Sequence, residues 1–313
     1  VIQFARFEKQ GTLPNMIQAE NAANRDTSDA PLWLITACAD LVRAEGDTQF
    51  IDSDCEGRSM RQILLSIGQS IKTGTPNGVR MDPESGLIFS PTHFSWMDTN
   101  HPAGTPRQGY PVEIQALWHA ALCFLSKIDS AETANAWQQL ARQVQDSILK
   151  YFWQPDLGYL SDCLHAAPGQ PAKGATVDDA LRPNQLLAIT LGAISEPSKS
   201  QKLLAVCQEL LVPGAIRSLA DRPARHGLEI HHHGKLINDP LHPYQGRYAG
   251  DEDTRRKPAY HNGTAWTWLF PSFAEAWAMT YGKESTQTAL SWLSSGAHLM
   301  AVSYTHLRAH ETF

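Results

Sequence analysis

The chain has 313 residues, enough to bury a sizeable core as one large domain or two ordinary ones. Its formal net charge of -6 argues against a nucleic-acid partner, because affinity for nucleic acid comes mainly from clustered Lys and Arg that neutralise phosphates. No apolar run approaches the roughly 18 residues of a transmembrane helix, so no membrane partner is predicted.

Apolar residues recur at helical spacing along most of the chain. These stripes predict helices near 31–45, 60–71, 114–128, 137–148, 183–193, 198–211, 264–281 and 285–300. Strand-like alternation is limited to short pieces such as GLIFS at 86–90 and GYLSD at 158–162. The pattern therefore predicts an all-α fold.

The connections between these helices alternate between short and long. KIDSAE at 127–132 is a tight connection in which Asp129 or Ser130 can cap the next helix. Gly/Pro-rich segments cover 73–111, 153–181 and 212–262, and loops of that length are uncommon unless they are functional. This alternation suggests helical hairpins packed side by side, for which an α/α toroid is the closed form.

The long loops are rich in side chains that bind sugars. A carboxylate can accept hydrogen bonds from two hydroxyls, and an aromatic ring can cover the apolar face of a pyranose. The first loop holds Trp96, Asp98 and Arg107, with Glu113 at the following helix start, and the last holds Arg247, Asp251, Tyr260, His261, Asn262 and Trp266. The composition of these loops favours a carbohydrate ligand.

Asp98 is the candidate general acid for hydrolysis of a glycosidic bond, which requires one acid and one carboxylate. Its neighbours Trp96 and Met97 would raise its pKa by desolvation. An isolated loop aspartate is more often a cap or turn residue. Glu113 has an ordinary explanation too, since a carboxylate in the first helical turn interacts well with the helix dipole.

The histidines and cysteines do not predict a metal centre. His231 to His233 are consecutive, so their side chains point in different directions, and no HExxH spacing accompanies them. A solvated loop is the favoured interpretation, and no metal or cofactor is predicted. The five cysteines are widely spaced without a CxxC pair, which is typical of free thiols in a reducing compartment and predicts a cytoplasmic protein.

Seven segments carry a family resemblance when they are taken together. They are GTLPN at 11–15, TSDAPLW at 27–33, GLIFSPTHFSWMD at 86–98, TPRQGYPVEIQALWHAAL at 105–122, LRPNQLLAI at 181–189, HPYQGRYAGD at 242–251 and AYHNGTAWTWL at 259–269. In this order they resemble the glucosidase domain of glycogen debranching enzymes, the amylo-α-1,6-glucosidase type. The resemblance covers nearly the whole chain to about residue 300.

The resemblance implies an (α/α)6 barrel of six hairpins, represented here by residues 1–302 and incomplete at both ends. It implies inverting hydrolysis of α-1,6-linked glucose at branch points of glycogen-like glucans, with Asp98 as the general acid. The substrate would be a branched α-glucan or oligosaccharide. The implied lining of the glucose pocket is Asp29, Trp33, Trp96, Arg107, Glu113, Trp118, Tyr260, His261 and Trp266.

Two departures from the family pattern concern the second catalytic carboxylate. The family segment that holds it would follow SSGAHLMAV, where this chain has SYTHLRAHETF at 303–313, interpreted as a non-native tail. Some relatives have a glutamate two residues after the YHNG-like motif, at the position of Ala265. The expected turnover of this chain is therefore very slow or nil. The alternatives are a carbohydrate-binding α/α barrel without catalysis and another α/α-barrel glycosidase.

Overall fold

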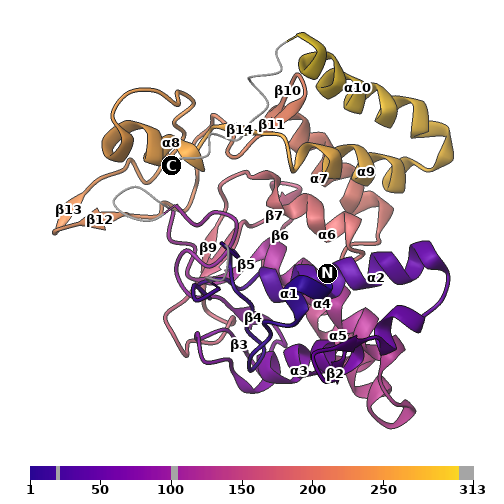
Figure 1. The fold of residues 1–313 in the computed structure, drawn as a ribbon. Coiled ribbons are helices and arrows are strands. Elements are labelled where there is room, and N and C mark those ends of the chain that lie inside the picture. The colour runs from indigo at the N-terminus through magenta and orange to yellow at the C-terminus, as the bar shows by residue number, and fades with distance from the viewer. Residues whose placement is uncertain (19–21, 100–104, 303–313) are drawn as a thin grey trace. The chain divides into compact units, whose positions relative to one another are not determined.

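A computed structural model describes residues 1–18, 22–99 and 105–302 (Figure 1). The chain divides into two compact units. Unit 1 consists of Val1–Asp98, Pro106–Tyr151 and Cys163–Thr176, and unit 2 of Thr99–Thr105, Phe152–Asp162 and Val177–Phe313. Within the described ranges, every helix is too short or too polar to cross a membrane.

Unit 1 is formed mainly by helices, with α2 and α3 both packed against α4. The helices are α1 (Ile2–Ala5), α2 (Ala30–Glu45), α3 (Met60–Thr73), α4 (Val112–Ile128) and α5 (Ala131–Phe152). Short antiparallel strand pairs lie in the connections: β1 (Asp54–Cys55) with β2 (Arg58–Ser59), β3 (Arg80–Met81) with β4 (Ile88–Phe89), and β5 (Gly109–Pro111) with β8 (Cys163–His165).

Local sequence explains where the helices of unit 1 begin and end. Ser59 caps α3, and its hydroxyl and the side chain of Gln62 form a reciprocal capping box. Helix α2 ends at Glu45 and is capped by Gly46, whose φ of 77° is a left-handed conformation that glycine adopts without a steric penalty. On α3, the buried residues Ile63, Leu64, Ile67 and Ile71 form the apolar stripe. These signals are local, which is why the sequence predicts them well.

Unit 2 is formed around α9, which packs against α6, α7 and α10. Its helices are α6 (Leu186–Thr190), α7 (Pro197–Cys207), α8 (Lys257–Tyr260), α9 (Phe270–Tyr281) and α10 (Thr286–Val302). Its strands are β6 (Trp153–Gln154) paired with β7 (Tyr159–Leu160), β10 (Leu211–Val212), β11 (Ala215–Arg217) and β14 (Ala265–Trp266) in one sheet, and β12 (His231–His232) paired with β13 (Lys235–Leu236). β9 spans Thr176–Asp178.

The prediction of a mainly helical chain is confirmed, with two local differences. The helix expected over 183–193 is a 3-10 turn followed by the short α6, and Gly192 lies just beyond it at a φ of 76°. The helix expected over 264–281 begins only at Phe270, because Ala265 and Trp266 pair with β11 instead. A closed ring of six hairpins stays a prediction, and the expected tail at 303–313 lies outside the described residues.

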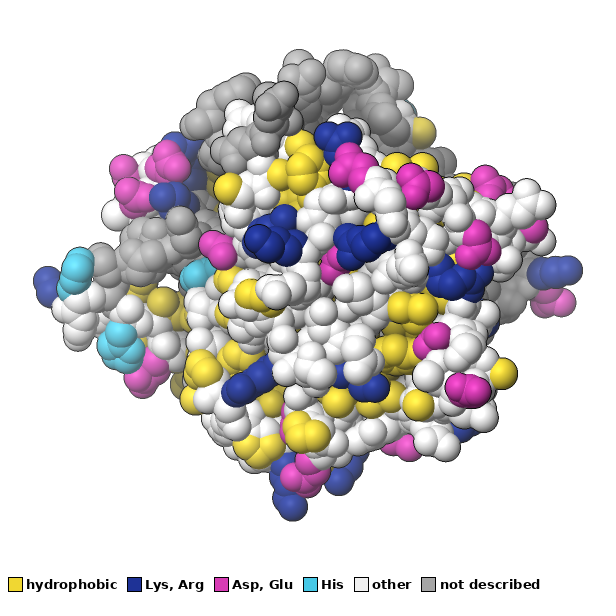
Figure 2. All heavy atoms as spheres, turned by 60° about the horizontal axis from the view of Figure 1, so that its bottom comes forward, with side chains coloured by type: hydrophobic (Ala, Val, Ile, Leu, Met, Phe, Trp, Pro, Cys, Tyr) yellow, Lys and Arg dark blue, Asp and Glu magenta, His cyan; other side chains and the backbone are white. Residues whose placement is uncertain are grey.

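Acidic and basic side chains are interspersed on the face shown in Figure 2, with hydrophobic side chains scattered between them. All five cysteines are described and are free thiols, and four of them are buried. Among the described residues, no three His, Cys, Asp or Glu side chains are close enough to hold a metal ion.

Candidate active site

Asp98 lies in the loop between β4 and β5 and is exposed to solvent. The pKa of its carboxyl is raised by desolvation, and this effect is opposed by its own backbone N–H and by a hydrogen bond from the Asn15 side chain. Asn15 belongs to a different segment of unit 1, so Asp98 is held by more than its own loop. An accessible carboxyl with a raised pKa has the properties of a general acid.

Asp29 lies immediately before α2, and its Oδ1 accepts a hydrogen bond of 2.6 Å from Thr27 Oγ1. The pKa of Asp29 is raised to about 6, mainly by burial, with further contributions from the negative charges of Glu113 and Asp98. The neighbouring Ser28 binds the Asp98 loop, since its N–H and its hydroxyl both donate to Phe94 O, at 2.7 and 2.8 Å. The carboxyl groups of Asp98 and Glu113 therefore act on Asp29 through their charges, and we refer to these three acidic residues of unit 1 as the carboxyl cluster.

Arg107 and Glu113 form a bidentate ion pair, with Nη1 to Oε1 at 2.5 Å and Nη2 to Oε2 at 2.6 Å. Both side chains are 2% exposed. Arg107 Nη1 also donates to Ser95 Oγ at 2.9 Å. The resemblance implied that both residues line the glucose pocket, but here their charged groups are buried and bound to each other.

A hollow of about 410 Å³ lies beside this cluster. Asn15, Asp29 and Trp33 line it together with the apolar residues Val1, Phe4, Leu13, Ala30, Leu34 and Ala37. Trp33 is half-buried, so part of the indole is open to a ligand. The hollow thus combines an acidic group and an aromatic surface, which is the combination a sugar requires.

Trp96 and Trp118, the other two tryptophans of unit 1 that were expected in the pocket, differ in their burial. Trp96 is half-buried, two residues before Asp98. Trp118 is fully buried on α4, and its Nε1 donates to Gly86 O at 3.1 Å. This placement corrects the expected role of Trp118, because a side chain without exposed surface packs the core and leaves no face for a sugar.

The three site residues expected in unit 2 form an aromatic cluster. The ring centroids of Tyr260 and Trp266 are 4.7 Å apart, and His261 stacks on Trp266 at 5.4 Å with an interplanar angle of 4°. Trp266 Nε1 donates to Tyr260 O at 3.0 Å. Tyr248 adds a fourth ring, 5.6 Å from Tyr260. The sequence analysis did not single out Tyr248, although it lies in one of the family-like segments.

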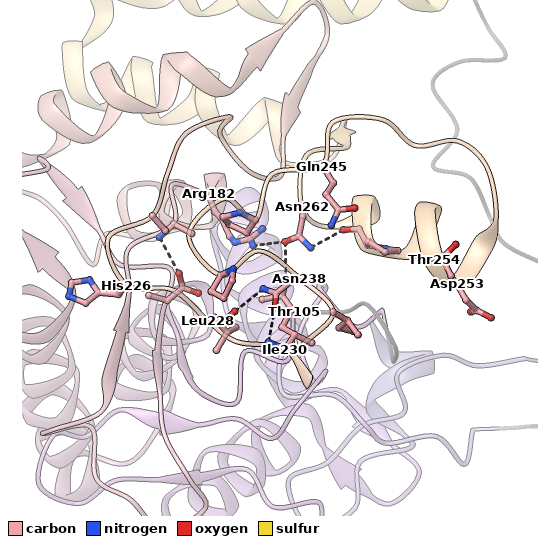
Figure 3. A pocket seen from close by; sticks show the side chains of 17 residues that line it. Thr105, Arg182, His226, Leu228, Ile230, Asn238, Gln245, Asp253, Thr254 and Asn262 are labelled. Atoms are coloured by element: carbon pink, nitrogen blue, oxygen red, sulfur yellow. Dashed lines mark hydrogen bonds between the residues drawn. The ribbon is translucent and has the colours of Figure 1, made fainter. Parts of the chain in front are cut away.

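Asn262 connects residues of unit 2 that come from three family-like segments (Figure 3). Its Oδ1 accepts hydrogen bonds from Thr105 Oγ1 at 3.0 Å and from Arg182 Nη2 at 2.7 Å. Its Nδ2 donates to Pro258 O at 2.8 Å. Sequence reasoning missed Thr105 and Arg182 as organising residues, although both belong to motifs that it quoted.

The Asn262 network borders a cavity of about 350 Å³. Its described lining combines apolar side chains with polar and charged ones and includes no aromatic side chain other than His226: Leu228, Ile230, Ile237, Pro240 and Pro243 lie there with Asp178, Arg182, Asn238, Gln245 and Asp253. The carboxyl cluster of unit 1 resembles a sugar site more closely, because it supplies an indole face next to acidic groups.

Comparison with known proteins places the chain in a family. The family model described as Amylo-alpha-1,6-glucosidase matches residues 1–312. Glycogen debranching enzyme of Saccharomyces cerevisiae is 22% identical over 373 residues, which cover 91% of this chain. The chain spans only 23% of the length of that relative.

Two solved structures show weak similarity. A rhamnosidase from Klebsiella oxytoca with rhamnose bound is 12% identical, with a TM-score of 0.45, over 66% of this chain and 36% of that one. The GH78 family rhamnosidase of Bacillus sp. GL1 is 17% identical, with a TM-score of 0.44, over 60% of this chain and 18% of that one.

The family match, which covers nearly the whole chain, places it in a family of glycoside hydrolases. It belongs to the amylo-alpha-1,6-glucosidase family, whose model matches nearly its whole length.

Proposed function

We propose that this chain supplies the general acid and the glucose pocket of an α-1,6-glucosidase that removes single glucose residues at branch points of glycogen-like glucans. The observation that carries the proposal is the cluster of Asp29, Asp98 and Glu113 beside a hollow lined by Asn15, Asp29 and Trp33. The family match and the similarity to a glycogen debranching enzyme support the choice of substrate.

Asp98 is the proposed proton donor. Desolvation raises its pKa, so its carboxyl keeps a proton to a higher pH than an ordinary aspartic acid. Its exposure lets a glycosidic oxygen approach the carboxyl. Protonation of that oxygen makes the sugar a better leaving group as the C1–O bond breaks.

Asp29 and Trp33 are the proposed sugar contacts of unit 1. Asp29 keeps acceptor capacity beyond the hydrogen bond from Thr27, and a glucose hydroxyl could donate to it. Trp33 offers an apolar face at the same hollow. Trp96 is a further proposed contact, and Tyr260 and Trp266 stay proposed sugar-binding residues of unit 2. His261, which was expected among them, is only 2% exposed and stacks on Trp266, so we propose that it supports that ring.

An inverting mechanism also needs a carboxylate about 6.5 to 9.5 Å from the acid, with a water between them. Glu113 is unsuited to this role because both its oxygens accept hydrogen bonds from Arg107. Asp29 has a pKa raised to about 6 and is mostly ionised at neutral pH, so its pKa does not exclude it. The resemblance implies a base in a segment that follows residue 302, and we therefore propose that the base is not a member of this cluster. We further propose an (α/α)6 barrel as the fold and the cytoplasm as the compartment.

The test of the acid is Asp98→Asn, which keeps the shape of the side chain and removes the proton. Release of glucose from dextrins with single 6-O-α-glucosyl branches should fall roughly 10²- to 10⁴-fold, the usual contribution of a general acid. Asp26→Asn, an exposed aspartate of the same unit, is the control and should leave the rate unchanged. Equal rates in Asp98→Asn and the unaltered chain would remove the acid assignment.

A second candidate function is carbohydrate binding without turnover. The observation that favours it is the engagement of both Glu113 oxygens by Arg107, which makes that carboxyl group unsuited to the role of the base that hydrolysis needs. Isothermal titration with isomaltose distinguishes the two functions. Heat of binding without release of glucose supports a binding protein, and glucose release excludes it.

A further inference from the structure

The ion pair of Arg107 and Glu113 is connected to the turn that carries Asp98. We propose that Arg107, Glu113 and Ser95 are positioning residues, which fix the orientation of the Asp98 carboxyl instead of contacting sugar. This inference rests on the proposed function of Asp98 as the proton donor.

A continuous path of hydrogen bonds leads from α4 to the turn. Glu113, in the first turn of α4, binds both terminal nitrogens of Arg107. Arg107 Nη1 donates to Ser95 Oγ at 2.9 Å, and Ser95 Oγ accepts from Met97 N at 3.4 Å. Asp98 is the next residue, so the path ends one peptide bond before the proposed acid.

Burial separates these residues from a ligand. Arg107 and Glu113 are 2% exposed, and Ser95 is also buried, whereas Asp98 is exposed. A planar guanidinium held by two parallel hydrogen bonds has a defined orientation, and the low dielectric of the interior strengthens each bond. The buried pair is therefore a rigid support for an exposed functional group.

The backbone of Arg107 is also unusual. Its φ of 46° lies in the left-handed region, which residues other than glycine seldom adopt. Such a conformation persists where surrounding contacts determine it, and it is more frequent at functional sites. The contacts of the Arg107 side chain with Glu113 and Ser95 help to hold this backbone conformation.

Positioning matters for the proposed reaction because proton transfer depends on geometry. In the rate-limiting step the Asp98 proton passes to the glycosidic oxygen, the C1–O bond breaks, and the oxygen of a water bonds to C1. That water gives its proton to the base. A displacement of about 1 Å in a catalytic group can cost about 10²-fold in rate.

The test uses Ser95→Ala, which removes the link to the turn and leaves the Arg107–Glu113 pair in place. Ser95→Thr restores a hydroxyl. Ser147→Ala is the matched control, because Ser147 is a buried serine of unit 1 whose hydroxyl donates to Ser85 O at 2.7 Å, away from Asp98. Each variant is assayed on an α-1,6-glucoside and on α-glucosyl fluoride, whose fluoride leaves with little need for a proton.

The expected result is a change in the ratio of the two rates. Ser95→Ala should lose about tenfold or more in kcat on the glucoside, with KM little changed, and keep its rate on the fluoride. Ser95→Thr should recover most of the loss, and Ser147→Ala should behave as the unaltered chain. An equal loss on both substrates would overturn the proposal, because a sugar contact or a general loss of structure would have that effect.

A second measurement does not require activity. Hydrogen exchange at the Met97 amide should be faster in Ser95→Ala, while amides of α4 and the thermal midpoint stay unchanged. If the chain hydrolyses neither substrate, the proposed function fails for this chain and the exchange rate alone decides the role of Ser95. An unchanged Met97 exchange rate would then overturn the proposal.

Discussion

Both units contain a deeply buried arginine, but the two side chains have different partners. Arg107 of unit 1 and Arg182 of unit 2 are each 2% exposed. Arg107 makes a bidentate pair with the Glu113 carboxylate. Arg182 donates mainly to neutral oxygens, namely Ser218 O, His261 O and Asn262 Oδ1, and its Nε lies 3.6 Å from Asp162 Oδ2.

The difference shows two uses of a buried cation. In unit 1 the arginine binds both oxygens of one carboxyl group of the acidic cluster. In unit 2 the arginine ties together backbone segments next to the aromatic cluster of Tyr260, His261 and Trp266. The first arginine is therefore held mainly by a carboxylate, whereas the second combines hydrogen bonds to neutral oxygens with an ion pair to Asp162.

Removal of one member of the unit 1 pair should have the largest effect on stability. Glu113→Ala leaves the Arg107 guanidinium buried without its carboxylate, and the expected loss is about 3–5 kcal/mol in the free energy of unfolding. Urea unfolding measures it.

The double variant Arg107→Met with Glu113→Leu is the control for this prediction. It removes both charges and should recover part of the loss, because apolar side chains of similar volume can replace a buried pair. A single-variant loss below about 1 kcal/mol would contradict a tightly coupled pair.

Asn262 in unit 2, which carries no charge, should be less sensitive to substitution. Asn262→Ala removes the acceptor for Thr105 and Arg182 and the donor to Pro258 O, with an expected loss of about 2–3 kcal/mol. Asn262→Asp keeps an acceptor oxygen and should lose less.

Asn238→Ala provides the matched comparison for Asn262→Ala. Asn238 also binds two backbone groups, Leu228 O and Ile230 N, but it is only half-buried, so the expected loss is about 1 kcal/mol. Equal losses at Asn238 and Asn262 would show that the connection to Arg182 adds nothing.

Asp29 should give a smaller effect than Glu113 or Asn262, and one that depends on pH. Its pKa is raised from 3.8 to about 6 in the folded chain, so the folded state binds the proton more tightly than the unfolded state. The stability that this proton provides is complete below the unfolded pKa and is lost as the pH rises towards about 6. The shift corresponds to at most about 3 kcal/mol at about 1.4 kcal/mol per unit, and partial exposure reduces it to about 1–2 kcal/mol.

Asp29→Asn tests this linkage by urea unfolding between about pH 4 and about pH 7. The unaltered chain should lose stability relative to Asp29→Asn across this range, and the variant should be the more stable protein at neutral pH. Asp26→Asn should follow the unaltered chain. Parallel curves for Asp29→Asn and the unaltered chain would contradict the raised pKa.

The elements that sequence predicted correctly are those with local signals. The stripe on α3 and its Ser59 capping box lie within a few residues of each other, so periodicity and capping define the helix. The helix expected from residue 264 fails at its start because β14 pairs with β11, almost fifty residues earlier in the chain. Strand pairing over that distance leaves little trace in the local pattern.

The sequence by itself determined the helical class of the fold and the family resemblance, and it suggested Asp98 as a candidate, because helix periodicity and ordered motifs are properties of the linear chain. Only the tertiary structure decided that Glu113 pairs with Arg107 and that Trp118 packs in the core. It also decided that Asp29 lies close enough to Asp98 and Glu113 for their charges to raise its pKa. The physical reason is that burial and electrostatic coupling depend on distances in space, which the spacing of residues along the chain does not define.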